Sequence, residues 1–245
     1  MQAATGVKEN VKSPWTVLIS ERHDSDIRTT RKIMKSPVCV YVDNSNIFHE
    51  GQRFASEQRG EDRYAFRIHF ARFIDLVTGS QAAQEIVWGG STPPTTDDVW
   101  RRLGERGIKP HLIPRSPSGE NETVDHIVQL QMYRHASKYA ATPGTMVVCT
   151  GDGKGYDNEE GFLFDVEGFV KAGWELRVVS WTHSCSARLK GFAEQNGKFI
   201  ALEEHYDEVT FLQGGRRAGA PRTQMSGDDS VESALAAKLK AAFKK

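Results

Sequence analysis

The sequence contains few of the features that assign a protein to a class at once. It has three cysteines, an odd number without Cys-x-x-Cys spacing, which indicates neither a zinc site nor a disulfide framework. Such cysteine usage is typical of a reducing compartment, so we expect a cytoplasmic protein. No stretch approaches the roughly 20 apolar residues of a membrane span, and the apolar run at residues 15–19 is too short for a signal peptide. We therefore expect no membrane partner.

Motifs for nucleophilic or zinc catalysis are also missing. Ser184 and Ser186 are not part of a Gly-x-Ser-x-Gly elbow, and we expect Ser186 to cap a helix instead. The histidines at positions 49, 126, 135 and 183 share no spacing typical of zinc ligands. Internal repeats are absent as well. The candidates for chemistry that remain are acidic residues.

Acidic and basic residues are balanced over the whole chain, with 32 of each, but not along it. Residues 37–213 contain 18 Lys and Arg against 25 Asp and Glu, a net charge of −7, so residues 1–36 and 214–245 together carry +7. An acidic core between basic arms suits a metal site that must still attract a polyanion. We expect residues 1–36 to be a partly disordered extension, 37–213 the folded domain that carries the site, and 214–245 a basic linker with a terminal helix at 231–243. A homodimer or a protein partner bound through these tails is compatible with this division.

Hydrophobic patterns alternate between strand and helix from residue 38 to residue 202. Buried parallel strands appear as short continuous apolar runs, whereas helices place apolar residues three and four apart. We expect strands at residues 38–42, 85–88, 109–113, 145–150, 174–181 and 198–202, the second one ended by Gly89 and Gly90. We expect helices after Asp43 and at residues 63–77, 96–105, 123–139, 162–172 and 186–195. This alternation predicts an α/β fold, three-layer αβα with a mainly parallel central sheet, of Rossmann-like type.

Three acids follow strands or open a helix in this arrangement. Asp43 follows the first strand, Asp152 follows the strand at 145–150, and Asp125 lies in the first turns of the helix at 123–139. Ligands of open α/β sheets bind outside the carboxyl ends of the strands. Acids that converge there raise one another's pKa, so the cluster implies a hard divalent cation with oxygen ligands, Mg²⁺ or Mn²⁺.

Each of these residues also has an ordinary structural explanation. Asn44 or Ser45 is suited to cap the helix that follows the first strand. Asp125 is suited to interact with the positive end of its helix dipole. Asp152 is suited to a turn. Only their joint placement favours a shared site.

The same residues carry a family resemblance. The strand followed by Asp43-Asn44-Ser45-Asn46, the Thr123-Val124-Asp125 helix start and the Thr150-Gly151-Asp152-Gly153 turn, in this order, resemble the NYN domain, a branch of the PIN-like ribonuclease superfamily. The strand at 174–181, followed by Ser184 and Ser186, resembles the next strand of that domain, and the similarity covers about residues 38–212. The resemblance implies a PIN-like fold and a catalytic metal site with Asp43, Asp125 and Asp152 as ligands. It also implies that Asn46 orients the substrate or a metal-bound water, that Thr150 lines the site, and that Ser184 contributes to substrate binding.

The sequence departs from the family pattern in two places. A Lys often precedes the helix acid in this family, whereas Glu120 and Glu122 occupy that region here. The family's last acid usually follows the Gly-Asp pair closely, whereas the segment from Gly153 to Glu160 is expanded. Asp157, Glu159 and Glu160 compete for that position, and we assign Asp157 as the fourth catalytic and metal-binding acid.

We therefore expect a Mg²⁺- or Mn²⁺-dependent ribonuclease that hydrolyses the phosphodiester bonds of RNA, because a bound cation activates water and stabilises charge on the phosphate. One alternative is a non-catalytic RNA-binding or scaffold module of the same fold, which the expanded segment before Glu160 keeps open. Another is a haloacid-dehalogenase-like phosphatase. That chemistry needs a second acid two residues after the nucleophilic Asp, but position 45 is Ser.

Overall fold

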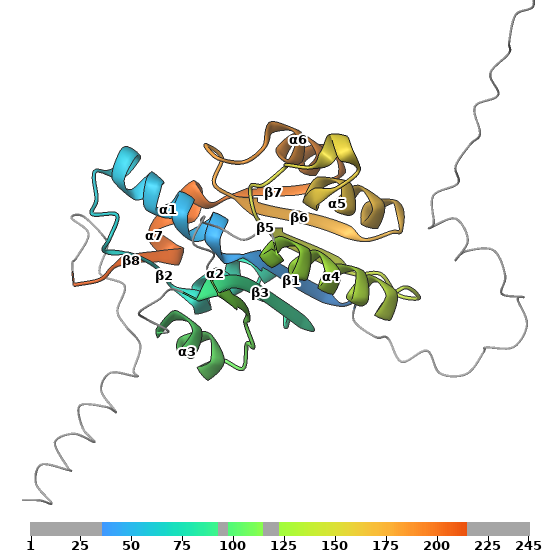
Figure 1. The fold of residues 1–245 in the computed structure, drawn as a ribbon, viewed down its shortest axis with the longest axis horizontal. Helices are drawn as coiled ribbons and strands as arrows, with labels where there is room; N and C mark the ends of the chain where they lie inside the picture. Colours follow the sequence, from blue (N-terminus) through green and yellow to red (C-terminus); the bar gives the residue numbers. More distant parts are fainter. Residues whose placement is uncertain (1–35, 93–97, 115–122, 215–245) are drawn as a thin grey trace, which may run out of the picture. The chain divides into compact units, whose positions relative to one another are not determined.

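The computed structural model describes residues 36–92, 98–114 and 123–214 (Figure 1). The chain divides into two units, Met1–Gln213 and Gly214–Lys245. The predicted N-terminal extension, apart from Ser36, and the predicted basic linker and terminal helix, apart from Gly214, lie outside the described residues. So do the first residues of the helix predicted at 96–105, together with Glu120 and Glu122.

A six-stranded parallel sheet forms the centre of the first unit, in the order β4-β3-β1-β5-β6-β7. Its middle strand β1 is buried at all six positions, which explains the continuous apolar run in the sequence. The predicted α/β fold with a mainly parallel sheet is confirmed. The strands are β1 (Val38–Asp43), β3 (Glu85–Thr92), β4 (His111–Pro114), β5 (Thr145–Cys149), β6 (Glu175–Ser180) and β7 (Gly197–Ala201).

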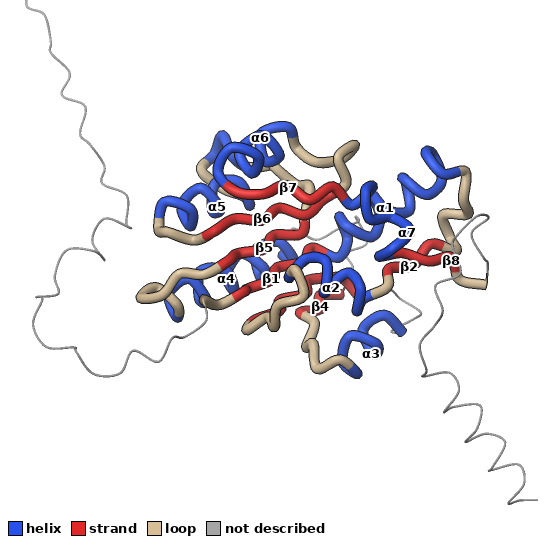
Figure 2. Tube along the Cα trace, turned by 180° about the vertical axis from the view of Figure 1, so that it is seen from behind, coloured by secondary structure: helices blue, strands red, loops and turns tan. Residues whose placement is uncertain are grey.

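Helices cover both faces of this sheet (Figures 1 and 2). Side chains of β1 alternate between the two cores: Val40 packs with residues of α1, α2 and α3, and Tyr41 packs with residues of α4, α5 and α6. The result is a three-layer αβα arrangement. The helices are α1 (Asn44–Arg59), α2 (Phe70–Thr78), α3 (Asp98–Glu105), α4 (Thr123–Lys138), α5 (Gly161–Lys171) and α6 (Ala187–Asn196). No helix among the described residues is long and apolar enough to cross a membrane.

A small antiparallel sheet of β2 (Phe66–Ile68) and β8 (Thr210–Leu212) was not expected from the sequence. The prediction of one helix over 63–77 is therefore wrong in its first part, and only α2 remains of it. The reason is tertiary: Phe66 pairs with Leu212, and the His69 N–H donates to the Val209 carbonyl at 2.8 Å. Pairing with a segment distant in sequence overrides the local helical pattern. The remaining short elements are η2 (Tyr156–Asn158), η3 (Leu202–His205) and α7 (Tyr206–Val209).

Gly89 and Gly90 do not end β3, as the sequence suggested, because the strand continues to Thr92. Their role is close packing on both faces. A Cβ atom at Gly89 would lie 2.6 Å from Val128 Cγ2, and one at Gly90 would lie 2.3 Å from the Trp100 ring. The missing side chains allow α4 and α3 to approach the strand from opposite sides.

Candidate active site

A cleft of about 530 Å³ opens at the carboxyl ends of β1 and β5, between the first turns of α1 and α4 and the loop that leads into α5. This is the position where ligands of parallel sheets bind. Most of the predicted site residues line it. They are Asp43, Asn46, Asp125, Asp152 and Ser184, together with Glu160.

Asp43 ends β1 and is at the same time the N-cap of α1. Its Oδ1 accepts a hydrogen bond from the Asn46 N–H at 3.2 Å, and its Oδ2 accepts one from Thr150 Oγ1 at 3.2 Å. The side chain is largely buried, and the residue is 7% exposed. The cap expected at Asn44 or Ser45 is therefore Asp43 itself. Asn44 instead accepts a hydrogen bond from Trp88 Nε1 at 3.0 Å.

Asn46 and Thr150 fix the loop that carries Asp152. Asn46 Oδ1 accepts a hydrogen bond from the Gly151 N–H at 2.7 Å, and Thr150 Oγ1 accepts one from the Asp152 N–H at 3.2 Å. Thr150 is fully buried and lies beneath the cleft rather than in its lining. Asp152 Oδ1 accepts a hydrogen bond from the Lys154 N–H at 2.9 Å. These bonds connect the acids after β1 and β5 into one network.

The loop after β5 packs closely against the start of α6. A Cβ atom at Gly153 would lie 2.3 Å from Ser186 Oγ, so only glycine fits there. Ser186 occupies the N-cap position of α6, but its side chain makes no capping hydrogen bond. Its N–H donates to the Gly151 carbonyl at 2.9 Å. The predicted capping role of the Ser186 side chain is wrong, and the residue instead contacts the cleft loop.

Asp125 reaches the cleft because α4 begins close to β3. Val124 and Val128 pack into the space left by Gly89, which brings the first turn of α4 to the ends of β1 and β3. Asp125 lies in that turn and lines the cleft with Gln129, one turn later. Asp43, Asp125 and Asp152 therefore share one cleft.

Asp157, predicted as the fourth acid, lies outside this cleft. It belongs to η2, its side chain is 81% exposed, and its carboxylate accepts a hydrogen bond from Arg188 Nη1 at 2.7 Å. Glu159 is not in the cleft lining either. Glu160 lines the cleft from the N-cap position of α5. Of the three acids that compete for the fourth position, Glu160 is the one that lines the cleft, whereas Asp157, which we assigned to that position, does not.

Several cleft residues were not selected from the sequence. His49 and Glu50 lie on α1 three and four residues after Asn46, and Gln129 lies four residues after Asp125 on α4. Helical spacing from the predicted residues would have found them, since such neighbours share a helix face. Lys154 lies in the Gly-rich loop, where no periodic pattern marks it.

The cleft has an excess of negative charge. Its lining contains five acids, and Lys154 is the one Lys or Arg among its described lining residues. Carboxylate oxygens are suitable ligands for Mg²⁺ or Mn²⁺. Among the residues that the structure describes, no group of three or more His, Cys, Asp or Glu is arranged to hold a metal ion. Mg²⁺ usually keeps several waters and takes one or two carboxylates plus substrate phosphates, so the donor set fits a hydrated ion rather than an all-protein cage.

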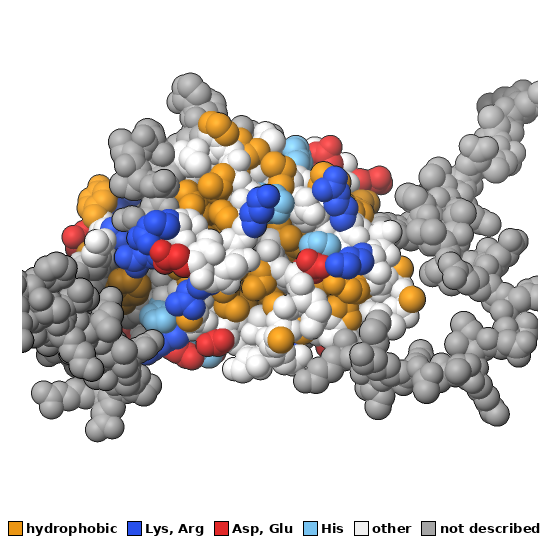
Figure 3. Space-filling model, turned by 90° about the horizontal axis from the view of Figure 1, so that it is seen from below, with side chains coloured by type: hydrophobic (Ala, Val, Ile, Leu, Met, Phe, Trp, Pro, Cys, Tyr) orange, Lys and Arg blue, Asp and Glu red, His pale blue; other side chains and the backbone are white. Residues whose placement is uncertain are grey.

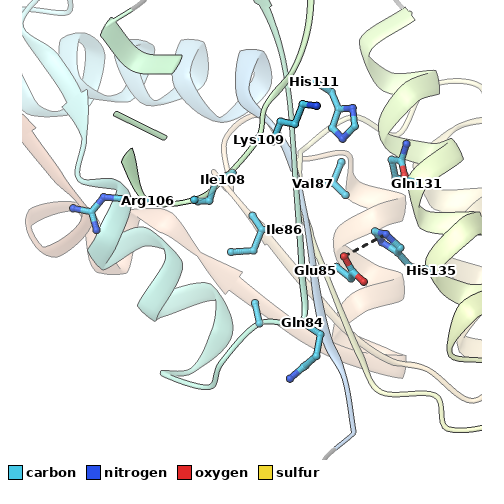
Figure 4. Close-up of a pocket in the computed structure, with 12 residues that line it drawn as sticks. Gln84, Glu85, Ile86, Val87, Arg106, Ile108, Lys109, His111, Gln131 and His135 are labelled. Atoms are coloured by element: carbon cyan, nitrogen blue, oxygen red, sulfur yellow. Dashed lines mark ion pairs between the residues drawn. The ribbon is translucent and has the colours of Figure 1, made fainter. Parts of the chain in front are cut away.

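A second cavity, of about 460 Å³, lies at the amino-terminal end of β3 beside α4 (Figure 4). Here a central acid is surrounded by partners: Glu85 lies 3.6 Å from His135 Nε2 and accepts hydrogen bonds from Lys138 Nζ at 2.5 Å and Tyr139 Oη at 2.9 Å. Burial raises the pKa of the Glu85 carboxyl, but these partners outweigh that effect and lower the pKa below its ordinary value. The charge of Glu85 is therefore balanced by partners within the chain.

The surface offers no single basic patch on the face shown in Figure 3. Among the described residues on that face, Lys and Arg side chains lie beside Asp and Glu side chains, with apolar side chains between them.

Comparison with known proteins adds little to this picture. No family model matches the chain, and no curated protein matches it. A protein of unknown function from Vibrio parahaemolyticus is similar in structure, with a TM-score of 0.48 and 16% sequence identity over 71% of this chain and 96% of that chain. A likeness at this level carries no argument about function.

Proposed function

We propose that the protein is a metal-dependent ribonuclease of the NYN type, which hydrolyses phosphodiester bonds of RNA with Mg²⁺ or Mn²⁺ at the cleft. The observation that carries this proposal is the convergence of Asp43, Asp125 and Asp152 from three different elements on one cleft. The order of the motifs along the chain, which resembles the NYN domain, supports the same assignment.

Asp43, Asp125 and Asp152 would hold a hydrated cation, in part through its waters, with Glu160 as a further acid of the same cleft. The chemistry that such an ion supplies is activation of a water and stabilisation of charge on the phosphate. Asn46 uses its carbonyl oxygen to hold Gly151, which leaves its amide NH₂ to donate to a phosphate oxygen. Lys154 would offset the charge of the incoming phosphate.

Magnitudes favour metal ligation over simple proton transfer as the role of these acids. Enzymes lower reaction barriers by roughly 8–23 kcal/mol. A positioned general acid or base alone contributes about 10²–10⁴-fold, or about 3–5 kcal/mol. A cation held by several carboxylates supplies the larger electrostatic contribution.

The basic flanks and the thiols fit an RNA-directed, cytoplasmic protein. The net charge of −7 within residues 37–213 repels nucleic acid, so the +7 of the flanking residues would attract it. All three cysteines are free thiols, and two of them, Cys39 and Cys149, are buried. Free buried thiols fit a reducing compartment.

A non-catalytic RNA-binding module is the second candidate. The observation that favours it is the spacing of the acids, since no described group of three is arranged to hold an ion directly. Such a module would bind RNA without cleaving it, which separates the two candidates by experiment.

The test is cleavage of end-labelled single-stranded RNA in Mg²⁺ or Mn²⁺ by the wild type, Asp43→Asn and Asp157→Asn. Asn caps helices as well as Asp does, so Asp43→Asn keeps the cap of α1 while it removes a ligand charge. We expect this variant to lose about 10²-fold or more of the activity, as is typical of damage to metal sites. Asp157→Asn, an exposed acid outside the cleft, is the matched control and keeps full activity. Cleavage by Asp43→Asn at the wild-type rate, or by the wild type in excess EDTA, would refute the proposal.

A further inference from the structure

Helices α4 and α5 meet beside the cleft through a buried carboxylate that the proposed hydrolysis does not use. Asp165 of α5 is 6% exposed. Its Oδ1 accepts a hydrogen bond from Tyr133 Oη at 2.5 Å, and its Oδ2 accepts one from Gln129 Nε2 at 2.6 Å. Both distances are short, as expected for bonds to an ionised acceptor.

The two donors continue the helix face that bears the cleft acid. Asp125, Gln129 and Tyr133 follow one another at intervals of four residues on α4, so their side chains share one face. Asp125 and Gln129 line the cleft, and Tyr133 packs on Phe169 of α5, with the ring centroids 5.2 Å apart. Asp165 thus contacts the face of α4 that bears Asp125.

The carboxylate also settles which way the Gln129 amide points. A carboxylate only accepts hydrogen bonds, so the amide atom beside it must be Nε2, and the carbonyl oxygen Oε1 is the other polar atom of the side chain. Gln129 lines the cleft, and its Oε1 can only accept hydrogen bonds. The partner that suits it in the cleft is a hydrogen-bond donor, and on a ribose or a hydrated cation the donors are O–H groups.

We propose that Asp165 is a positioning residue, which fixes the Gln129 amide so that Oε1 accepts a hydrogen bond from an O–H group bound in the cleft. That donor is either a ribose hydroxyl of the substrate or a water of the hydrated cation, and these two sources share the same chemistry. The identity of the ligand rests on the proposed function. The hydrogen bond between Asp165 and Gln129 is independent of it.

Because Asp165 is buried, its substitution should change the stability of the fold in a direction that separates a positioning role from a structural one. Burial raises the pKa of the Asp165 carboxyl, and the hydrogen bonds from Tyr133 and Gln129 oppose that effect without cancelling it. A folded-state pKa above the unfolded value stabilises the fold at low pH and costs stability as the pH rises through the folded value. Asp165→Asn removes this cost at neutral pH. A merely structural role predicts that activity and stability fall together, whereas positioning predicts that activity falls while stability holds or rises.

The first experiment needs no activity. Side-chain amide signals of the full-length protein are recorded by two-dimensional ¹H–¹⁵N NMR, and the Gln129 pair is assigned as the one missing in Gln129→Leu. We expect that pair to be shifted downfield and protected from exchange with water in the wild type, and to lose both properties in Asp165→Asn. The matched control is Glu167→Gln on the same helix. Glu167 also accepts a hydrogen bond from a tyrosine, Tyr156 Oη at 2.8 Å, but it does not line the cleft.

The second experiment measures cleavage and melting temperature for the same variants. We expect Asp165→Asn to lower kcat on RNA by about ten- to 10²-fold, since a misplacement of about 1 Å in a site can cost 10²-fold. KM should be unchanged, and the melting temperature should be unchanged or higher. Glu167→Gln should keep the wild-type kcat. A DNA oligonucleotide of the same sequence distinguishes the two donors: a loss confined to RNA assigns the ribose hydroxyl, and an equal loss assigns a metal-bound water.

An amide pair of ordinary shift and exchange in the wild type would overturn the proposal, as would a melting temperature that falls in step with kcat. If the wild type cleaves no nucleic acid, the proposed function fails. The amide spectrum then still decides whether Asp165 fixes Gln129.

Discussion

The two ends of the central sheet both hold acidic residues in polar cavities, but they differ in how the charge is balanced. At the amino-terminal end of β3, Glu85 is surrounded by Lys138, Tyr139 and His135. At the carboxyl end, five acids line a cleft with one lysine among its described lining residues, and one of these acids, Glu50, also contacts Arg53 and His183. An acid whose counter-charge comes from the same chain stabilises structure. Like charges at one place are costly, and this is why we propose that the cleft binds a cation from outside the chain.

The largest expected effect comes from substituting acids of the cleft and comparing the result with a substitution of Glu85 at the other end of the sheet. Asp125→Asn and Asp152→Asn should each lower RNA cleavage by about 10²-fold or more. Their free energy of unfolding without metal should hold or rise by about 1 kcal/mol, because repulsion among the acids is relieved. Glu85→Gln should leave cleavage unchanged. Cleavage assays and denaturant titrations give both values, and a large loss of activity in Glu85→Gln would contradict the division into two roles.

A second prediction concerns the charge outside the cleft. The candidate cations are Arg216, Arg217, Arg222 and the C-terminal lysines. Each phosphate that a cation neutralises contributes about 0.7 to the slope of log affinity against log salt. If three or four of these cations contact phosphates, deletion of residues 214–245 should flatten that slope by about two to three units. Binding of a labelled single-stranded oligonucleotide over a salt series measures the slope. Cleavage of a dinucleotide, too short to reach the tail, serves as the control and should not change. Equal slopes for both proteins would mean that the tail does not contact the nucleic acid.

A smaller effect separates the acids of the loop before α5. Glu160→Gln should lower cleavage about tenfold, because Glu160 lines the cleft and would act through the waters of the ion. Asp157→Asn should leave it unchanged, because its carboxylate contacts Arg188 outside the cleft. Rates at several Mn²⁺ concentrations would show whether Glu160→Gln weakens metal binding. The opposite ranking of the two variants would restore Asp157 as the fourth acid.

The smallest effect is a pH-dependent change at the other end of the sheet. The pKa of Glu85 is lowered in the folded protein, so its contribution to stability is present above the unfolded pKa and is lost as the pH falls through the folded value. Glu85→Gln should therefore lower stability at pH 7 by about 1 kcal/mol or less, as for other partly exposed ion pairs. The difference from the wild type should shrink as the pH falls below the ordinary Glu pKa of about 4.3 and disappear once the pH is below the lowered folded value. A difference in melting temperature that persists there would point to lost packing instead.

The positions of the parallel strands along the chain were predictable, because buried parallel strands carry a strong sequence signal. The run from Val38 to Val42 is apolar throughout, and the structure buries all of it. Phe66 could not be placed correctly, because its strand exists only through pairing with Leu212, far along the chain. Local pattern contains no information about such a partner.

The acids at strand ends were predictable for a related reason, since the carboxyl ends of parallel strands meet at one edge. The choice between Asp157 and Glu160 was not, because it depends on the path of a loop with positive φ at Gly155, Glu159 and Gly161. Asp165 was invisible for another reason. It lies in an apolar stretch of α5, and its two hydrogen-bond donors, Gln129 and Tyr133, belong to α4, so only the packing of the two helices identifies them.

The site also depends on a residue that carries no functional group. Gly89 has no side chain, and Val124 and Val128, on either side of Asp125, occupy the space that a methyl group would fill. This close packing positions the first turn of α4, and with it Asp125, although Gly89 itself does not line the cleft. A larger residue at position 89 would push α4 away from the strand and so change the distance between Asp125 and Asp43. The geometry of the site can therefore be altered without substituting any residue that lines the cleft.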